Sequence, residues 1–458
     1  MKRRDFLQHT LFGSAATLGA GLGLHDLANS QSQSGGYKAV VLLFLNGGND
    51  GNDIIVPTDG AYKDYQKARP SIALGTDSLT PFTSTLMDHR MGLNSALSPL
   101  MPLFQQKRLS FLVNAGPLVQ PTTVADVLNR RAKLPPFLYS HPEQTQTVMG
   151  WTGDEDPSGW AGRGIEAMPN YKSFKAPLMA VDGQGATLVT GQKSRYIAAN
   201  SNFSRNMGEA NLLDNNNPMT RAIESLTRLQ SDNQVQAEYA RTFRASFLDA
   251  VELAKVDQVT PQPAGNFANN DIGNKLKFLA RSMNYYRTAG ASRQVFSVQW
   301  GSFDTHTNQR GAATNGGQGG QDSQLADLAA ALTAFDDSIK AAGMDQEVVV
   351  LVASEFGRTL DPASGGGSDH AWGSHWWAMG GPVLGGQMLG HHFPSLVLRG
   401  VDDVDPGGRG YWVPQIASDQ VAGELLTWLG LPQEKLVQVL PNLANFANFA
   451  NRKVGFLA

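Results

Sequence analysis

The segment EVVVLVASEFGRTLDPASGGGSDHAWGSH, residues 347–375, contains the clearest structural signal in the chain. Its apolar run, Val348–Ala353, has the length and composition of a buried parallel strand. Glu355 follows the run, and a glycine-rich loop then brings Asp369, His370 and His375. Ligands of open α/β sheets bind outside the carboxyl ends of strands. Because carboxylates and imidazoles are ligands for Zn²⁺ or Mn²⁺, the segment predicts a metal site at a sheet edge.

Two other apolar runs end in the same kind of residue. Ala39–Leu45 leads into a Gly/Asn loop that carries Asp50, and Val295–Trp300 leads directly to Asp304 and His306. Parallel strands of one sheet bring such residues to a common cleft. We therefore expect three strand ends to converge on one site. Its candidate metal ligands are Asp50, Asp304, His306, Glu355, Asp369, His370 and His375.

Each candidate also has a purely structural alternative. Asp50 could be a turn residue, because Asn and Asp favour turns. Asp304 and His306 could cap a loop, Glu355 could pair with Arg358, and Asp369-His370 could be a hydrogen-bonded loop pair. Their coincidence at three strand ends favours a metal or polyanion site. Arg358 is then expected to clamp an oxyanion.

The remaining pattern is that of an α/β protein. Strand Leu109–Val113 and helices over 272–288 and Ser418–Leu429 are predicted, and residues 325–339 place apolar side chains on one helix face. The middle of the chain, at about 117–270, is less regular and includes a mostly helical stretch, Asn216–Val256. We interpret this middle region as an insertion or cap over the sheet.

Composition excludes several classes of protein. The 458 residues are 41% hydrophobic and 17% charged, which fits a globular protein with a large core. The formal net charge of −3 argues against nucleic acid as a partner. The absence of cysteine excludes disulfides, thiolate metal sites and a cysteine nucleophile.

Residues 1–30 have the pattern of a twin-arginine signal peptide. Arg3-Arg4 precedes a weakly apolar run, and Ala28-Asn29-Ser30 offers small residues at a cleavage site. The run is too short and glycine-rich for a permanent membrane span. We expect cleavage after Ser30, with the twin-arginine export machinery as a partner and a periplasmic or secreted location. The alternative is an ordinary amphipathic N-terminal helix.

The tryptophans Trp372, Trp376 and Trp377 surround the loop that carries His370. They could form a wall on which a sugar stacks. Aromatic side chains in such numbers are more often buried mass in a core, and we favour that interpretation.

Several of these motifs together resemble the exported family called domain of unknown function 1501. They are the GGxDG-like stretch Asn46–Pro57, Phe303-Asp304-Thr305-His306, Ser354-Glu355-Phe356-Gly357-Arg358-Thr359, and Asp369-His370. The resemblance covers nearly the whole chain after residue 30 and is weakest in the middle.

The resemblance implies an alkaline-phosphatase-like fold for residues 31–458: a three-layer α/β sandwich with a mostly parallel central sheet and an inserted cap. Relatives in that superfamily include phosphatases, sulfatases and phosphomutases, which mostly use two metal ions. By similarity Asp50 would contact a metal, and Asp304 and His306 would serve one ion. Ser140, in a Ser-His pair that the family often has, is the expected nucleophile.

The chain departs from the family pattern at three positions. Phe356 stands where well-studied relatives place a metal-binding histidine, which argues for one ion rather than two. Asn94 replaces the histidine of the usual Gly-Leu-His-Pro stretch, and Pro142 follows Ser140-His141.

The leading hypothesis is an exported metal-dependent hydrolase of phosphate or sulfate esters, with one or two divalent ions and a small-molecule or glycan ester as substrate. The alternative is an exported binding or assembly protein that keeps the fold and has lost the chemistry. A third hypothesis is a carbohydrate-active protein that uses the tryptophans.

Overall fold

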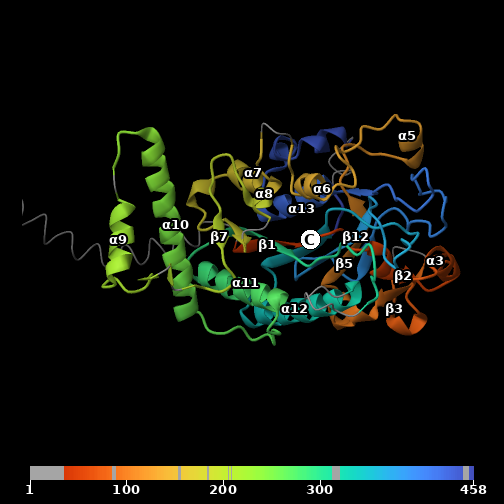
Figure 1. Cartoon of the computed structure of the whole chain (residues 1–458), viewed down its shortest axis with the longest axis horizontal. Coiled ribbons are helices and arrows are strands. Elements are labelled where there is room, and N and C mark those ends of the chain that lie inside the picture. The colour runs from red at the N-terminus through yellow and green to blue at the C-terminus, as the bar shows by residue number, and fades with distance from the viewer. Residues whose placement is uncertain are drawn as a thin grey trace, which may run out of the picture.

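The central sheet brings together strands from the whole length of the chain (Figure 1). The computed structural model describes residues 36–84, 89–152, 156–182, 185–204, 206–207, 209–228, 230–311, 320–446 and 453–458. The expected signal peptide, 1–30, lies outside these ranges. The strand order is β13 (Gln387–Leu389), β5 (Leu109–Gly116), β12 (Ser374–Met379), β11 (Val348–Ser354), β1 (Lys38–Leu45), β10 (Arg293–Trp300), β6 (Leu178–Val181) and β7 (Ile197–Ala199), with β14 (Ile416–Ala417) paired to β5.

The sheet is mostly parallel, as predicted. β12 runs antiparallel to its neighbours β11 and β5, whereas the other pairs of the sheet are parallel. The centre consists of β11, β1 and β10, the three strands predicted to carry the site. Leu45 of β1 lies opposite Ser354 of β11 and Trp300 of β10. The three strands therefore end level with one another, and the residues that follow them share one edge.

Helices cover both faces of this sheet, which confirms a layered α/β architecture (Figure 1). Val41 and Leu43 of β1 belong to the core formed with α11 (Asp271–Thr288) and α12 (Gln321–Ala341), whereas Val40 and Leu42 face the core formed with α7 (Trp160–Ala167) and α13 (Ser418–Leu429). The alternation follows from the period of two in a strand. The first layer contains α4 (Met101–Gln105), α11 (Asp271–Thr288) and α12 (Gln321–Ala341); the second contains α7 (Trp160–Ala167), α8 (Ala186–Val189), α13 (Ser418–Leu429) and α14 (Leu436–Val439).

The region expected to form an insertion or cap is partly sheet. β6 and β7 lie within residues 117–270, and they extend the central sheet beyond β10. Beyond them, α9 (Pro218–Leu226) and α10 (Gln234–Val259) stand at one end of the molecule (Figure 1). Between β5 and β6 the chain forms α5 (Val124–Leu128) and α6 (His141–Val148), and α6 reaches the predicted site.

Segments that follow β1 in the sequence form a small antiparallel sheet. It consists of β2 (Ile55–Pro57), β4 (Arg90–Asn94) and β3 (Leu79–Thr83), and the helix α3 (Tyr62–Ala68) follows β2. A second pairing joins β8 (Asn206–Met207) and β9 (Ala210–Asn211). In the part of the chain that the structure describes, no helix is both long and apolar enough to cross a membrane.

The three tryptophans are core residues. Trp372, Trp376 and Trp377 are each about 1% exposed. Trp376 and Trp377 lie on β12 and point to opposite faces of the sheet, into the two separate cores. This burial confirms the packing interpretation and removes the sugar-stacking wall on which the third hypothesis depended.

Candidate metal centre

Three side chains that could hold a metal ion meet at the edge where β10 and β11 end. Among the described residues, His141, Asp304 and His370 each offer one ligand atom, and these three atoms lie within 4.8 Å of one another. Asp304 follows β10, His370 lies in the loop between β11 and β12, and His141 is the first residue of α6. The site is thus built from two strand ends and one helix of the region between β5 and β6.

His306 completes this cluster. Its Nε2 lies 2.9 Å from Asp304 Oδ1 and 3.0 Å from His370 Nε2. On the other side, His141 Nε2 lies 3.1 Å from His370 Nε2 and 3.5 Å from Asp304 Oδ2. Three imidazoles and one carboxylate therefore converge, and we refer to these four residues as the His₃Asp cluster.

Each imidazole is oriented by an acceptor at its other nitrogen. His141 Nδ1 is 2.7 Å from Glu355 Oε1, and His306 Nδ1 is 2.7 Å from Asp369 Oδ1. His370 Nδ1 is 2.8 Å from the carbonyl oxygen of Tyr139. These acceptors assign the proton of each neutral ring to Nδ1, which leaves a lone pair on each Nε2. Metal-binding histidines are oriented in this way.

The cluster fits a divalent cation. Three Nε2 lone pairs and a carboxylate facing one another repel, and a cation between them reverses the sign of that interaction. Tetrahedral ligands of Zn²⁺ at its usual bond lengths lie about 3.3 Å from one another, and His370 Nε2 lies 3.1 Å from His141 Nε2 and 3.0 Å from His306 Nε2. Imidazoles with one carboxylate suit Zn²⁺ among the common metals. The side chains are between 24% and 43% exposed, so a ligand can reach them from solvent.

Arg358 holds Asp304 in place rather than facing a ligand. Its buried guanidinium donates to the carbonyl oxygens of Gly47, Gly48 and Ser368 and to Asp304 Oδ1. Burial opposes ionisation of Asp304, but the Arg358 guanidinium lowers its pKa to about 2. The expected oxyanion clamp is therefore corrected: internal acceptors engage both terminal nitrogens and Nε of Arg358, and the side chain is shielded from solvent.

Phe356 forms an apolar wall behind two of the imidazoles. Its ring centroid lies 4.8 Å from that of His141 and 4.7 Å from that of His370. The turn after β1 packs against the same ring, because a Cβ on Gly48 would lie 2.4 Å from a Phe356 ring carbon. Gly48 also has a positive φ of 66°. In this chain the position thus supplies packing, and no ligand, to the cluster.

Asp50 lies in a separate buried network. Its carboxylate pairs with Arg69 and accepts hydrogen bonds from Gln309 (2.7 Å) and Asn52 (2.8 Å). Burial raises the pKa of this carboxyl, but the nearby Arg69 charge together with these hydrogen bonds lowers it overall. The structure therefore does not place Asp50 among the ligands expected at the three strand ends.

Two predicted ligands orient histidines instead of joining the cluster, and a third lies elsewhere. Glu355 and Asp369 accept from His141 and His306, as described above. His375 is in β12, fully buried, and its Nδ1 accepts from the backbone N–H of Asn114 at 3.1 Å. Burial lowers the pKa of His375 to about 3, which keeps the ring neutral.

Ser140 lies next to the cluster without contacting it. It is the N-cap residue of α6, and its hydroxyl donates to Glu143. The residues on either side of Ser140 both reach His370, Tyr139 through its carbonyl and His141 through its ring. Tyr139 has a positive φ of 72°, a conformation that costs a non-glycine residue energy and is concentrated at functional sites.

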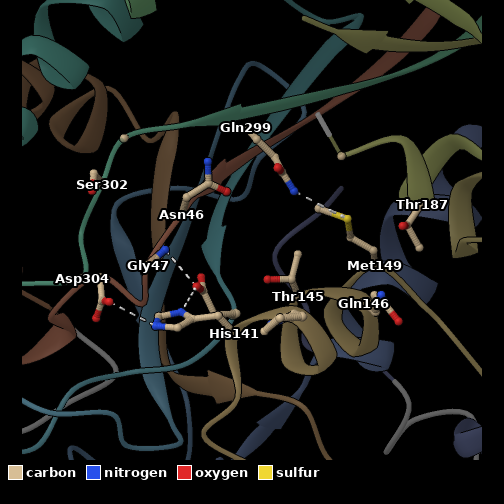
Figure 2. A pocket seen from close by; sticks show the side chains of 14 residues that line it. Asn46, Gly47, His141, Thr145, Gln146, Met149, Thr187, Gln299, Ser302 and Asp304 are labelled. Carbon is tan, nitrogen blue, oxygen red and sulfur yellow. Dashed lines mark hydrogen bonds and ion pairs between the residues drawn. The ribbon is translucent and has the colours of Figure 1, made fainter. Parts of the chain in front are cut away.

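A cavity of about 470 Å³ opens beside the cluster. His141 and Thr145 of α6 and Met149, which follows that helix, line it, and Asp304 and Glu355 line it from the strand ends. Figure 2 shows His141 beside Asp304 at one side of this space, with Asn46 and Gln299 across from Thr145. Its size is that of a small-molecule site.

The family model described as "Protein of unknown function (DUF1501)" matches residues 37–395. The chain belongs to this family. That assignment confirms the family expected from Asn46–Pro57 and the other motifs. A comparison with curated proteins found no match.

Solved structures give only a broad likeness to this DUF1501 chain. Ps i-CgsB in complex with k-i-k-neocarrahexaose has 8% identity and a TM-score of 0.33, with 87% of this chain and 74% of that chain covered. The PsFucS1 sulfatase from Pseudoalteromonas sp. has 11% identity and a TM-score of 0.32, covering 79% and 66%. The lipoteichoic acid synthase LtaP from Listeria monocytogenes has 9% identity and a TM-score of 0.32, covering 84% and 75%. The activity proposed for this chain therefore rests on its own residues.

Within this DUF1501 chain, His141 is the functional residue that sequence reasoning missed. The Ser140-His141 pair drew attention to the serine, whereas the histidine beside it offers a ligand atom to the cluster. The available signal was the count of histidines: three of the seven that follow residue 30 lie in the motifs, and His141 is a fourth in a stretch that resembles the family. Nothing in the local spacing indicates the Tyr139 carbonyl, which orients His370 from 231 residues away.

Proposed function

We propose that this chain is a metal-dependent hydrolase of phosphate or sulfate esters. The observation that carries the proposal is the His₃Asp cluster, with each imidazole oriented by an acceptor at Nδ1. His141, His306, His370 and Asp304 would hold one divalent ion, Zn²⁺ or Mn²⁺. Such an ion, when bound, polarises an ester oxygen and lowers the pKa of a bound hydroxyl or water.

The test measures metal content and activity together. We expect the purified wild-type protein to contain one equivalent of metal and to hydrolyse 4-nitrophenyl phosphate or 4-nitrophenyl sulfate. His370→Ala should lose both. His392→Ala is the matched control, because His392 is 53% exposed and pairs with Asp402. A folded wild-type protein that takes up no metal and hydrolyses neither ester contradicts the proposal.

Ser140 is our proposed nucleophile, with Glu143 as its base. A nucleophile and its base must lie within hydrogen-bond reach, and the Ser140 hydroxyl donates to the Glu143 carboxylate. The Oγ would bond to the phosphorus or sulfur atom as the ester oxygen leaves, the serine proton would pass through Glu143 to that leaving oxygen to give the alcohol, and water would then release the bound acid. We expect Ser140→Ala to lower turnover on the order of 10³-fold with unchanged metal content. Turnover that persists in Ser140→Ala would instead assign the attack to water.

A catalytically degenerate binding or assembly protein is the second candidate. One observation favours it. Arg358 was expected to clamp negative charge, but its nitrogens donate to acceptors inside the protein. This candidate predicts a stoichiometric metal ion with no turnover on phosphate, sulfate or phosphonate esters. The metal and activity measurements on wild type and His370→Ala separate the two candidates.

We also propose export by the twin-arginine pathway to the periplasm or beyond. The support is the Arg3-Arg4 pattern within residues 1–30. That pathway carries folded proteins, which suits a site assembled from residues as distant in the sequence as His141 and His370. A reporter fused to residues 1–30 should be exported, and replacement of both arginines by lysine should stop its export. Export of the doubly substituted reporter contradicts the proposal.

A further inference from the structure

The cavity beside the His₃Asp cluster is lined by six uncharged polar side chains. Three are amides and three are hydroxyls, contributed by the ends of β1 and β10, by α6 and by α8 (Figure 2). They are Asn46, Gln146, Gln299, Thr145, Thr187 and Ser302. None of them is needed to hold or orient the metal ligands, so their role lies with whatever occupies the cavity.

Within the described part of the chain, these side chains form few hydrogen bonds with the rest of the protein. Gln299 Nε2 has a single weak partner, the sulfur of Met149 at 3.9 Å. The Thr147 hydroxyl, by contrast, bonds back to the Glu143 carbonyl at 2.8 Å. Within the described ranges, no hydrogen bond is formed by the side chains of Asn46, Thr145 or Ser302. Helix α6 therefore satisfies Thr147 internally and leaves the Thr145 hydroxyl for the cavity.

The charges around the cavity are acidic. Asp304 and Glu355 line it, and its described lining contains neither lysine nor arginine. An ester that carried a second anionic group would meet no lysine or arginine side chain of this lining to pair with it, which selects against such a ligand. An amide or hydroxyl lining can both donate to and accept from neutral hydroxyl groups.

We propose that this cavity binds the uncharged, polyhydroxylated part of the substrate, a sugar or polyol, while the ester group faces the His₃Asp cluster. The inference rests on the proposed function, because it assigns the alcohol portion of the same ester. Recognition is by amides and hydroxyls, not by the buried tryptophans.

The test measures binding of probes that carry no ester. Saturation-transfer NMR would compare methyl glucoside, methyl galactoside and methyl mannoside with glucuronate, each at millimolar concentration, on the full protein. We expect at least one methyl glycoside to bind and glucuronate to bind at least tenfold more weakly. Gln299→Leu and Thr145→Val should each abolish the signal with metal content unchanged. Gln433→Leu is the matched control, because Gln433 is exposed and does not line the cavity.

The outcomes separate this inference from the proposed function. Absence of binding by all three glycosides, or glucuronate binding as tightly as they do, overturns the inference. If glycosides fail to bind and 4-nitrophenyl phosphate is still hydrolysed, the neutral cavity assignment fails alone. If a glycoside binds through Gln299 and no ester is hydrolysed, the cavity assignment stands and the hydrolase proposal fails.

Discussion

At the scale of single residues, the cluster is defined by the partners of its imidazoles. A histidine is a good metal ligand only when the correct nitrogen faces the ion, and a hydrogen bond at the other nitrogen fixes that choice. Glu355 does this for His141, and its buried carboxylate also accepts from the backbone N–H of Gly47 at 2.8 Å and from the Ser354 hydroxyl at 2.8 Å. Glu355 therefore couples the end of β1 and the end of β11 to a ligand on α6.

Glu355→Gln should weaken metal binding without unfolding the protein. The substitution keeps the shape of the side chain and an acceptor for His141 but removes the negative charge that strengthens the imidazole as a ligand. We expect the metal affinity to fall about 10- to 100-fold, measured by competition with a chelator. Asp327→Asn, at an exposed carboxylate on α12, is the control. An unchanged affinity in Glu355→Gln would mean that Glu355 serves only the packing of the strand ends.

At the scale of elements, the sequence predicted the strands well and their surroundings less well. Apolar runs 348–353 and 295–300 became β11 and β10 with shifts of one or two residues at their ends. β12 was not predicted, because both of its faces are buried and its sequence therefore lacks the alternation of apolar and polar residues that marks a half-exposed strand. His375 was consequently expected in a loop near the cluster, whereas it is the second residue of a buried strand.

The candidate site was predictable where a side chain that can bind a metal comes directly after a strand in the sequence. Asp304 and His306 come immediately after β10, and both belong to the cluster. Asp50 follows β1 in the same way, but Arg69, 19 residues later, takes its carboxylate. The pairing of Asp50 with Arg69 depends on how α3 packs against the loop after β1. Such a tertiary contact cannot be read from the local sequence pattern.

The turn after β1 is an element that the cluster requires. Gly48 adopts a φ of 66°, and a Cβ there would meet the Phe356 ring at 2.4 Å. Gly48→Ala should therefore lower the free energy of unfolding by about 1–3 kcal/mol through overpacking and backbone strain. Urea unfolding measures the change. Gly60→Ala is the control, since no atom lies within 4 Å of its added Cβ, and an equal loss in both variants would refute the role of the turn.

At the scale of the whole molecule, the second helical layer contains a buried carboxyl that links three of its elements. Asp419 lies in α13, near the Arg163 charge of α7, and it accepts a hydrogen bond from Asn442. Burial raises the pKa of Asp419 to about 6, although Asn442 and Arg163 act in the opposite direction. This layer packs on the face of β1 that carries Val40 and Leu42, so its stability supports the strand ends that bear the cluster.

A raised pKa makes the stability of this layer depend on pH with a definite sign. Between about pH 4 and pH 6 the folded protein keeps a proton on Asp419 that the unfolded chain releases. The stabilisation is fully present below pH 4 and is lost as pH rises through the folded pKa. Wild type should therefore lose about 3 kcal/mol relative to Asp419→Asn across this window and change little above pH 7. Denaturant unfolding at pH 4, 5, 6 and 7 measures the difference, with Asp327→Asn as the control. A difference that stays constant, or that grows in favour of wild type as pH rises, would show that Asp419 is ionised in the folded layer throughout.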